Sequence, residues 1–147
     1  MVTTIFFKKL SDLAKEPTKG SEHAAGWDLY AATADPVQIE PGQMKKIPTD
    51  IAVELPVYSF GAVYPRSGIA TKRGLRLAND VGIIDADYRG NVIVALYNDS
   101  SETQTIAPQE RIAQMIVSPY INISFKEVEE LETTRRGKSG FGSSGTN

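Results

Sequence analysis

Short apolar runs separated by turn residues recur along the whole chain. Most residues in these runs are β-branched or aromatic, and such side chains fit the pleated surface of a sheet. The pattern predicts strands over residues 4–8, 27–31, 45–55, 60–64, 81–84, 92–96, 103–106 and 111–120. Many short strands divided by proline and glycine indicate an all-β protein, built as a jelly-roll-like barrel or sandwich.

Helical patterns are weak by comparison. Prolines from Pro36 to Pro119 stand where a strand should start, stop or bulge. The best helix candidate covers residues 67–73, which allows two turns at most, with Ser67 as its N-cap. We therefore expect one short helix within the β fold.

The segment from Asp80 to Asn98 concentrates polar chemistry between two apolar arms. Residues 81–84 and 92–96 predict the arms of a β-hairpin, and the turn between them carries Asp85 and Tyr88. Rigid arms would hold the carboxylate and the ring in fixed positions. We interpret this turn as a concave ligand-binding site.

Composition and charge exclude several classes of function but do not identify one. Eighteen acidic and sixteen basic residues give a formal charge of -2, which offers no basic surface for duplex nucleic acid. There is no cysteine and a single histidine, so a divalent metal would need oxygen ligands. No stretch has the apolar length of a membrane helix or the pattern of a signal peptide. We expect a cytoplasmic protein with no nucleic acid or membrane partner.

The composition changes near residue 135. Residues 1–134 predict a single β domain, whereas residues 135–147 are rich in glycine and serine. Such a tail cannot bury enough apolar surface to offset its ordering entropy, so we expect it to be flexible when free. Arg136 and Phe141 favour a lid that closes over a nucleotide, with the arginine on a phosphate and the ring on a base. A flexible terminus without a role is the alternative.

Three more positions are candidates for ligand binding. Backbone N–H groups near Arg66, Ser67 and Gly68 favour an anion, although a plain turn capped by the serine is the alternative. Asp28 lies in a strand-like run, where an acid costs stability unless it is paired with an arginine or serves a ligand. Gln114 lies on an otherwise apolar strand and either meets a ligand or satisfies backbone groups.

Five segments, taken in order, resemble the five motifs of trimeric dUTPases. They include Pro-Arg-Ser-Gly at 65–68 and Ile-Asp-Ala-Asp-Tyr-Arg-Gly at 84–90, and the full set covers residues 24–30, 65–68, 82–90, 111–114 and 136–145. The resemblance spans nearly the whole chain and is far more specific than any single motif. It implies a jelly-roll-like homotrimer with three active sites, each assembled from several subunits. The implied activity is hydrolysis of dUTP to dUMP and pyrophosphate, which limits uracil in DNA and supplies dUMP for thymidylate synthesis.

The resemblance also implies roles for single residues. Asp85 would bind the 3′-hydroxyl and orient the water that attacks the α-phosphate. Tyr88 would lie beneath the deoxyribose and leave no space for a 2′-hydroxyl. Recognition of uracil, largely through backbone groups, falls on Asn79, Ile83, Ile84, Asp85 and Ile93.

The implied phosphate site lies elsewhere in the sequence. Arg66, Ser67 and Gly68 would hold the triphosphate with Gln114 nearby. Mg²⁺ would be bound by phosphate oxygens, and Asp28 would reach it through water. The closing tail would bring Arg136, Phe141 and Gly142 onto the nucleotide.

Three other functions are consistent with parts of the pattern. A dCTP deaminase of the same fold would need a glutamate beside the exocyclic amine, where this chain offers Asp85. A dUTP-sensing regulator would use the nucleotide site to control a protein partner. A purely structural jelly-roll protein would leave the acidic turn without a role.

Overall fold

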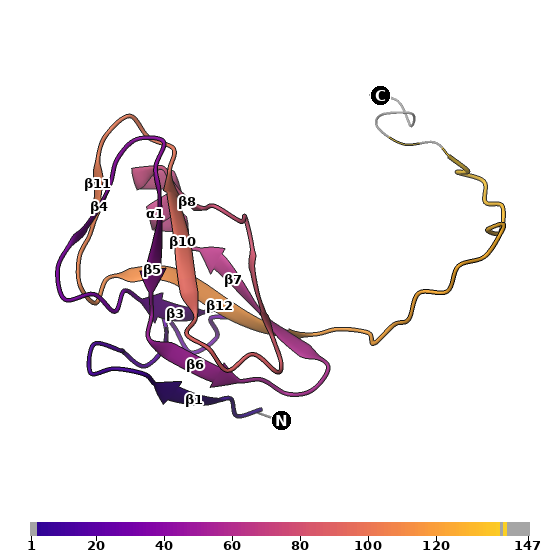
Figure 1. Ribbon diagram of the computed structural model, residues 1–147, viewed down its shortest axis with the longest axis horizontal. Helices are drawn as coiled ribbons and strands as arrows, with labels where there is room; N and C mark the ends of the chain where they lie inside the picture. The colour runs from indigo at the N-terminus through magenta and orange to yellow at the C-terminus, as the bar shows by residue number, and fades with distance from the viewer. Residues whose placement is uncertain (1–2, 139, 141–147) are drawn as a thin grey trace.

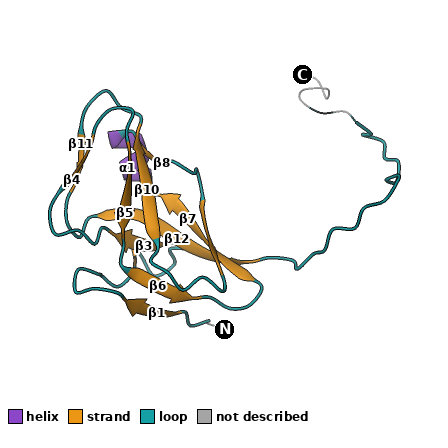
Figure 2. Cartoon of the chain, in the orientation of Figure 1, coloured by secondary structure: helices purple, strands orange, loops and turns teal. Residues whose placement is uncertain are grey.

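The computed structural model describes residues 3–138 and residue 140. Within that part of the chain, strands dominate and α1 (Ser67–Arg73) is the one α-helix (Figure 2). The strands are β1 (Phe6–Lys9), β2 (Thr18–Lys19), β3 (Trp27–Tyr30), β4 (Val37–Ile39), β5 (Met44–Pro48), β6 (Ile51–Glu54), β7 (Ser59–Pro65), β8 (Leu75–Leu77), β9 (Gly82–Asp85), β10 (Ile93–Asn98), β11 (Gln104–Ile106) and β12 (Arg111–Pro119). The prediction of an all-β fold with one short helix is confirmed.

Two larger sheets form the body of the molecule (Figure 1). One has five strands in the order β2-β3-β12-β7-β9, and the other has three in the order β5-β10-β8. The pairs β1-β6 and β11-β4 complete the set, and neighbouring strands are antiparallel throughout. Alternate side chains of both sheets join one apolar core, which includes Leu29, Ile47, Leu96 and Ile112. This is the expected jelly-roll-like sandwich.

The strand predicted over residues 45–55 is two strands. β5 ends at Pro48 and pairs with β10, whereas β6 begins at Ile51 and pairs with β1. Between them, Asp50 has a left-handed backbone with φ 50°. A continuous strand cannot accommodate that conformation, and aspartate is one of the few residues that adopts it readily. The chain therefore changes sheets at this point.

The hairpin predicted between residues 80 and 98 is wrong in its pairing. β9 pairs with β7 in the five-stranded sheet, and β10 pairs with β5 and β8 in the other. The two arms follow each other in sequence but lie in different sheets. The segment between β9 and β10 therefore passes from one sheet to the other and is not the turn of a hairpin.

The helix α1 has the predicted range but a different cap. Arg66 is the N-cap, with φ -79° and ψ 140°, and Ser67 is the first helical residue. No side-chain hydrogen bond caps this end in the described residues. The cap lies at Arg66 because β7 continues to Pro65 and Arg66 keeps an extended backbone, so the helix begins one residue later. At the other end Gly74 adopts φ 63°, the left-handed conformation that favours glycine after a helix.

The chain after β12 leaves the sandwich as an arm (Figure 1). Described residues 120–138 contain no strand or helix. Ile121, Ile123 and Phe125 are 84%, 66% and 96% exposed, and they occupy every second position. That spacing places three apolar side chains on one face of an extended segment.

No helix among the described residues combines the length and apolar character needed to cross a bilayer.

Gly61 is a sharp test of packing on the five-stranded sheet. It pairs with Val117 on one side and Ile84 on the other. A methyl group added there would lie 2.9 Å from Met115 Sδ and 3.3 Å from Ile84 Cβ. We expect Gly61→Ala to lower the free energy of unfolding by about 1–3 kcal/mol, measured by urea denaturation.

The control for this variant is Gly20→Ala. A methyl group at Gly20 meets no atom within 4 Å, so its effect should be close to zero. Equal unfolding free energies for the two variants would contradict the close packing at Gly61.

Candidate active site

A cavity of about 230 Å³ opens between the end of β9 and the start of β10. Its walls are Ile83, Ile84, Asp85, Tyr88, Asn91 and Ile93. Five of these residues are sequence-predicted site residues, and the structure brings them together. Asn91 was not predicted, because nothing in the local pattern distinguishes it from an ordinary turn asparagine.

The cavity lies where the two sheets diverge. β9 is the outermost strand of its sheet, so its second edge has no strand partner among the described residues. At Ile93, β10 pairs only with β5, because β8 begins to pair at Leu96. Strand edges of this kind present alternating backbone donors and acceptors. A flat polar ligand can therefore hydrogen-bond to backbone on both sides of the cavity.

Tyr88 lies across the turn that closes this cavity. Its hydroxyl donates to the carbonyl oxygen of Asn91 at 3.0 Å. Its ring packs against Gly90 so closely that a Cβ on that glycine would lie 2.5 Å from the Cζ atom of the ring. The ring orientation is thus set by the backbone beneath it.

Asp85 borders the cavity and is exposed. No side-chain hydrogen bond or ion pair engages its carboxylate within the described part of the chain. Its oxygens are therefore available to accept hydrogen bonds from a ligand or from water.

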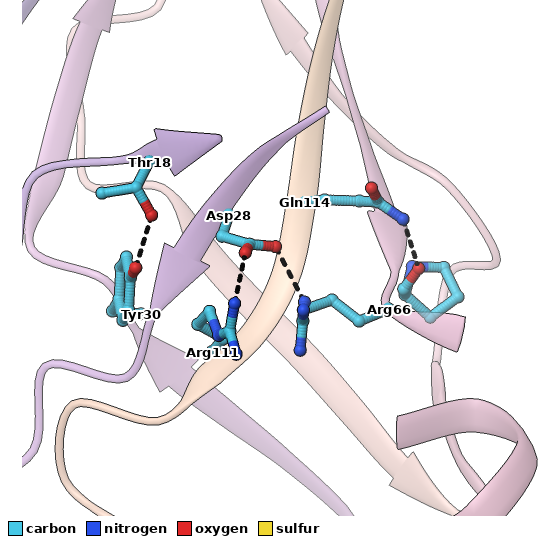
Figure 3. A network of polar contacts seen from close by, with 7 residues as sticks. Thr18, Asp28, Tyr30, Arg66, Arg111 and Gln114 are labelled. Atoms are coloured by element: carbon cyan, nitrogen blue, oxygen red, sulfur yellow. Dashed lines mark hydrogen bonds and ion pairs between the residues drawn. The ribbon is translucent and has the colours of Figure 1, made fainter. Parts of the chain in front are cut away.

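A second polar group centres on Asp28, which is 6% exposed (Figure 3). One carboxylate oxygen accepts from Arg66 Nε at 2.7 Å, and the other accepts from Arg111 Nη1 at 3.3 Å. The arginine pairing considered from sequence is therefore present. Two arginines offset the cost of burying one acid.

The arginines of this cluster remain partly open to solvent, with side chains 30% and 47% exposed for Arg66 and Arg111. Two guanidinium groups beside one carboxylate leave a local excess of positive charge. Arginine held in this way is suited to bidentate contact with phosphate oxygens. The cluster is a candidate anion site.

Gln114 completes this side of the sheet. In the strand register it stands between Asp28 on β3 and Tyr64 on β7, and its Nε2 donates to the carbonyl oxygen of Pro65 at 3.1 Å (Figure 3). A Cβ on Gly26 would lie 2.5 Å from its Oε1. In this structure Gln114 therefore satisfies a backbone carbonyl group, which is one of the two roles considered from the sequence.

The remaining predicted residues lie at the margins. Ser67 and Gly68 begin α1 directly after Arg66, and a methyl group on Gly68 would meet no atom within 4 Å. Asn79 does not line the cavity, but its Nδ2 would lie 3.5 Å from a Cβ on Gly82, at the start of β9. Arg136 is exposed on the arm. Phe141 and Gly142 lie outside the described residues.

The two polar groups are far apart in the single chain. Asp85 pairs with Phe60 near the start of β7, whereas Arg66 follows Pro65 at its end. Six residues of strand at about 3.3 Å each separate Phe60 and Arg66 by roughly 20 Å. One chain by itself therefore does not bring the cavity and the arginine cluster together.

The described residues include no group of three or more histidine, cysteine or acidic side chains that could hold a metal. Asp28 is the carboxylate of the arginine cluster, and both of its oxygens already accept from arginine. With both oxygens engaged, Asp28 has no free oxygen for direct coordination, so a cation at this cluster would need to be bound by a phosphate ligand, with any contribution of Asp28 passing through water.

Known proteins resemble this chain along nearly its whole length. The dUTPase family model matches residues 12–145, a range that includes all five segments singled out in the sequence. The chain belongs to the dUTPase family. The resemblance drawn from the five motifs is therefore confirmed, and with it the enzyme class.

Relatives and solved structures agree with this dUTPase assignment. The deoxyuridine 5′-triphosphate nucleotidohydrolase of Rickettsia bellii is 46% identical over 145 residues, covering 98% of this chain and 97% of that protein. The protein of the same name from Desulfitobacterium hafniense is 48% identical over 132 residues, covering 89% and 87%. The dUTPase of Staphylococcus bacteriophage 80alpha, solved with dUpNHpp, is 31% identical with a TM-score of 0.85, covering 98% and 99%. The dUTPase of phage phi11, described with a structural Mg(II) ion, is 27% identical with a TM-score of 0.81, covering 89% and 100%.

Proposed function

We propose that this protein hydrolyses dUTP to dUMP and pyrophosphate by attack of water on the α-phosphate. The observation that carries the proposal is the cavity between β9 and β10, which gathers exposed strand edges, Asp85 and Tyr88. Family membership and the nucleotidohydrolase relatives support the same reaction. The reaction limits uracil in DNA and provides dUMP for dTMP synthesis.

Backbone groups of Ile83 to Asp85 and of Ile93 recognise the uracil edge in this proposal. A strand edge is a suitable reader, because a pyrimidine presents both donors and acceptors. Cytosine reverses part of that pattern and would leave backbone groups unpaired, which is costly in a closed site. The methyl group of thymine needs space beyond C5, and in this proposal the cavity wall at that position rejects it.

Asp85 acts as the general base. Its carboxylate has no partner within the described residues, so it can orient a water molecule and accept its proton during attack on the α-phosphorus. Tyr88 supports the sugar and excludes a 2′-hydroxyl. Asn79 stands near the base at the start of β9.

The arginine cluster binds the triphosphate. Arg66 and Arg111 are held in place by Asp28, and backbone N–H groups at Ser67 and Gly68 add donors at the start of α1. Mg²⁺ carried by the phosphates would neutralise part of their charge and help pyrophosphate leave. Asp28 would contact this ion through water, and Gln114 would lie nearby.

We further propose that the protein is a homotrimer whose active sites are shared between subunits. The separation of roughly 20 Å along β7 supports sharing, because Asp85 and Arg66 must act on one nucleotide. In a closed ring, the cavity of one subunit would face the arginine cluster of the next.

Exposed apolar surface supports the same assembly. Ile121, Ile123 and Phe125 on the arm are largely exposed within the described part of the chain. A groove of about 710 Å³ between the N-terminal segment and the start of β7 is lined largely by apolar side chains, among them Phe7, Trp27, Val53 and Val57. An exposed apolar face and an open apolar groove on one chain are typical of an interface between copies.

The tail residues Arg136, Phe141 and Gly142 complete the proposal. An arginine that reaches the γ-phosphate and a ring that stacks on uracil would close the site and exclude bulk water. Arg136 lies near the end of the extended arm, which can carry the tail to a neighbouring subunit.

The deciding experiment is pyrophosphate release from dUTP, dTTP, dCTP and UTP in parallel, with Mg²⁺ present. We expect release from dUTP alone, because base and sugar are both selected at the cavity. Ammonia release from dCTP would instead indicate a deaminase. Binding of dUTP without any release would indicate a nucleotide-sensing regulator.

A further inference from the structure

The connection between β5 and β6 supports the active-site turn from behind. Thr49 Oγ1 donates to the carbonyl oxygen of Val92 at 2.7 Å, and the Val92 N–H donates to the carbonyl oxygen of Ile51 at 2.9 Å. Beside them, Asn91 Nδ2 donates to Asp50 Oδ1 at 2.6 Å. These three bonds fasten the last residues of the turn to the point where the chain changes sheets.

Asp50 is itself held on three sides. Ser11 Oγ donates to its other carboxylate oxygen at 2.5 Å, and the Leu10 N–H donates to its carbonyl oxygen at 2.8 Å. Its backbone has φ 50°, a conformation that few residues adopt without strain. An aspartate with a left-handed backbone and both carboxylate oxygens engaged is well suited to fix the position of Asn91.

Asn91 in turn fixes Tyr88. Its carbonyl oxygen accepts the Tyr88 hydroxyl, while its Oδ1 is buried and has no partner among the described residues. A buried acceptor without a partner costs free energy, so the bond to Asp50 must hold the amide in this orientation. Gly90 provides the surface on which the ring rests.

We propose that Asp50 and Gly90 are positioning residues for Tyr88, and that they set the preference of this protein for deoxyribose over ribose. The inference rests on the proposed function, in which the Tyr88 ring excludes the 2′-hydroxyl. Neither residue touches the nucleotide. Both act by keeping the ring where a ribose would collide with it.

Gly90→Ala moves the ring directly. The added methyl group would overlap the Tyr88 ring, and the ring must turn away from the sugar. Among the described glycines, Gly90 is not one with a positive φ, so alanine introduces no backbone strain there. We expect the ratio of kcat/KM for dUTP to that for UTP to fall about tenfold or more.

Asp50 allows a matched pair of variants. Asp50→Gly keeps the left-handed backbone but removes the acceptor of Asn91, and it should lower the same ratio by a similar factor. Asp50→Asn keeps both the backbone preference and an acceptor oxygen, so it should retain the wild-type ratio.

The readouts separate positioning from stability and from the proposed function. The dUTP-to-UTP ratio of kcat/KM is measured for wild type and all three variants, with dUMP and UMP binding by calorimetry. A ratio that stays at the wild-type value in Gly90→Ala and Asp50→Gly, even with activity lowered on both substrates, overturns the inference. A wild type that binds dUMP over UMP but releases no pyrophosphate overturns the proposed function alone, and the binding ratios of the variants still test the positioning.

Discussion

Asp85→Asn should lower kcat for dUTP by about 10²–10⁴-fold and leave the affinity for dUMP nearly unchanged. The amide has the size of the carboxylate and can still hydrogen-bond to the 3′-hydroxyl, but it cannot take a proton from water. The carboxylate has no competing partner within the described residues, so under the proposed mechanism its loss removes the base and little else. Steady-state pyrophosphate release and dUMP calorimetry measure the two effects.

The neighbouring Asp87→Asn is the matched control. Asp87 lies in the same turn, is exposed and does not line the cavity. Its kcat should stay within a factor of two of wild type. A comparable loss in both variants would assign the effect to the charge of the turn, and an active Asp85→Asn would remove Asp85 from the mechanism.

Mixing two inactive variants should restore activity. In the proposed homotrimer, Asp85→Asn lacks the base and Arg66→Ala lacks the phosphate ligand, so each variant alone should be nearly inactive. In a mixed ring, the intact Asp85 of one subunit can face the intact Arg66 of its neighbour. About one quarter of the sites in a randomly mixed head-to-tail ring would then be complete. Activity is measured after co-refolding the two chains in equal amounts.

Two controls accompany the mixing experiment. Light scattering should give a mass near three times the 16.0 kDa of one chain. A chain that carries both substitutions, mixed with wild type, separates complementation from simple dilution of wild-type sites. Mixtures that stay as inactive as their components would show that each subunit forms its own site.

Local patterns predicted the strands well and their partners poorly. The apolar runs around Val63 and Leu96 are strands as predicted, because β-branched and aromatic residues favour a pleated surface wherever it lies. The arms around the Asp85 turn were predicted to pair with each other. Adjacency in sequence favours a hairpin. In the fold, β9 pairs instead with β7 and β10 pairs with β5, and local sequence does not reveal these partners.

The candidate site was likewise predicted where it depends on local sequence and missed where it depends on contacts between distant segments. The residues that line the cavity are close in sequence, and their order alone indicated a common site. Asn91 and Asp50 were missed, because the bond between them joins positions 41 residues apart. The pairing of Asp28 with Arg66 and Arg111 depends on β3, β12 and the end of β7 lying side by side in the sheet. From the sequence alone, arginines could be predicted only as possible ion-pair partners of Asp28.

The divergence of β9 and β10 has a consequence for the substrate itself. Among the described residues, β9 has one edge with no strand beside it, and the start of β10 at Ile93 lies ahead of its pairing with β8, so a pyrimidine between them would hydrogen-bond to both. The base would then do what a short extra strand does in other sandwiches, joining two sheets across their seam. On this view the nucleotide is a removable structural element. Its hydrogen bonds to β9 and β10 would form when substrate binds and break when product leaves, once in each turnover.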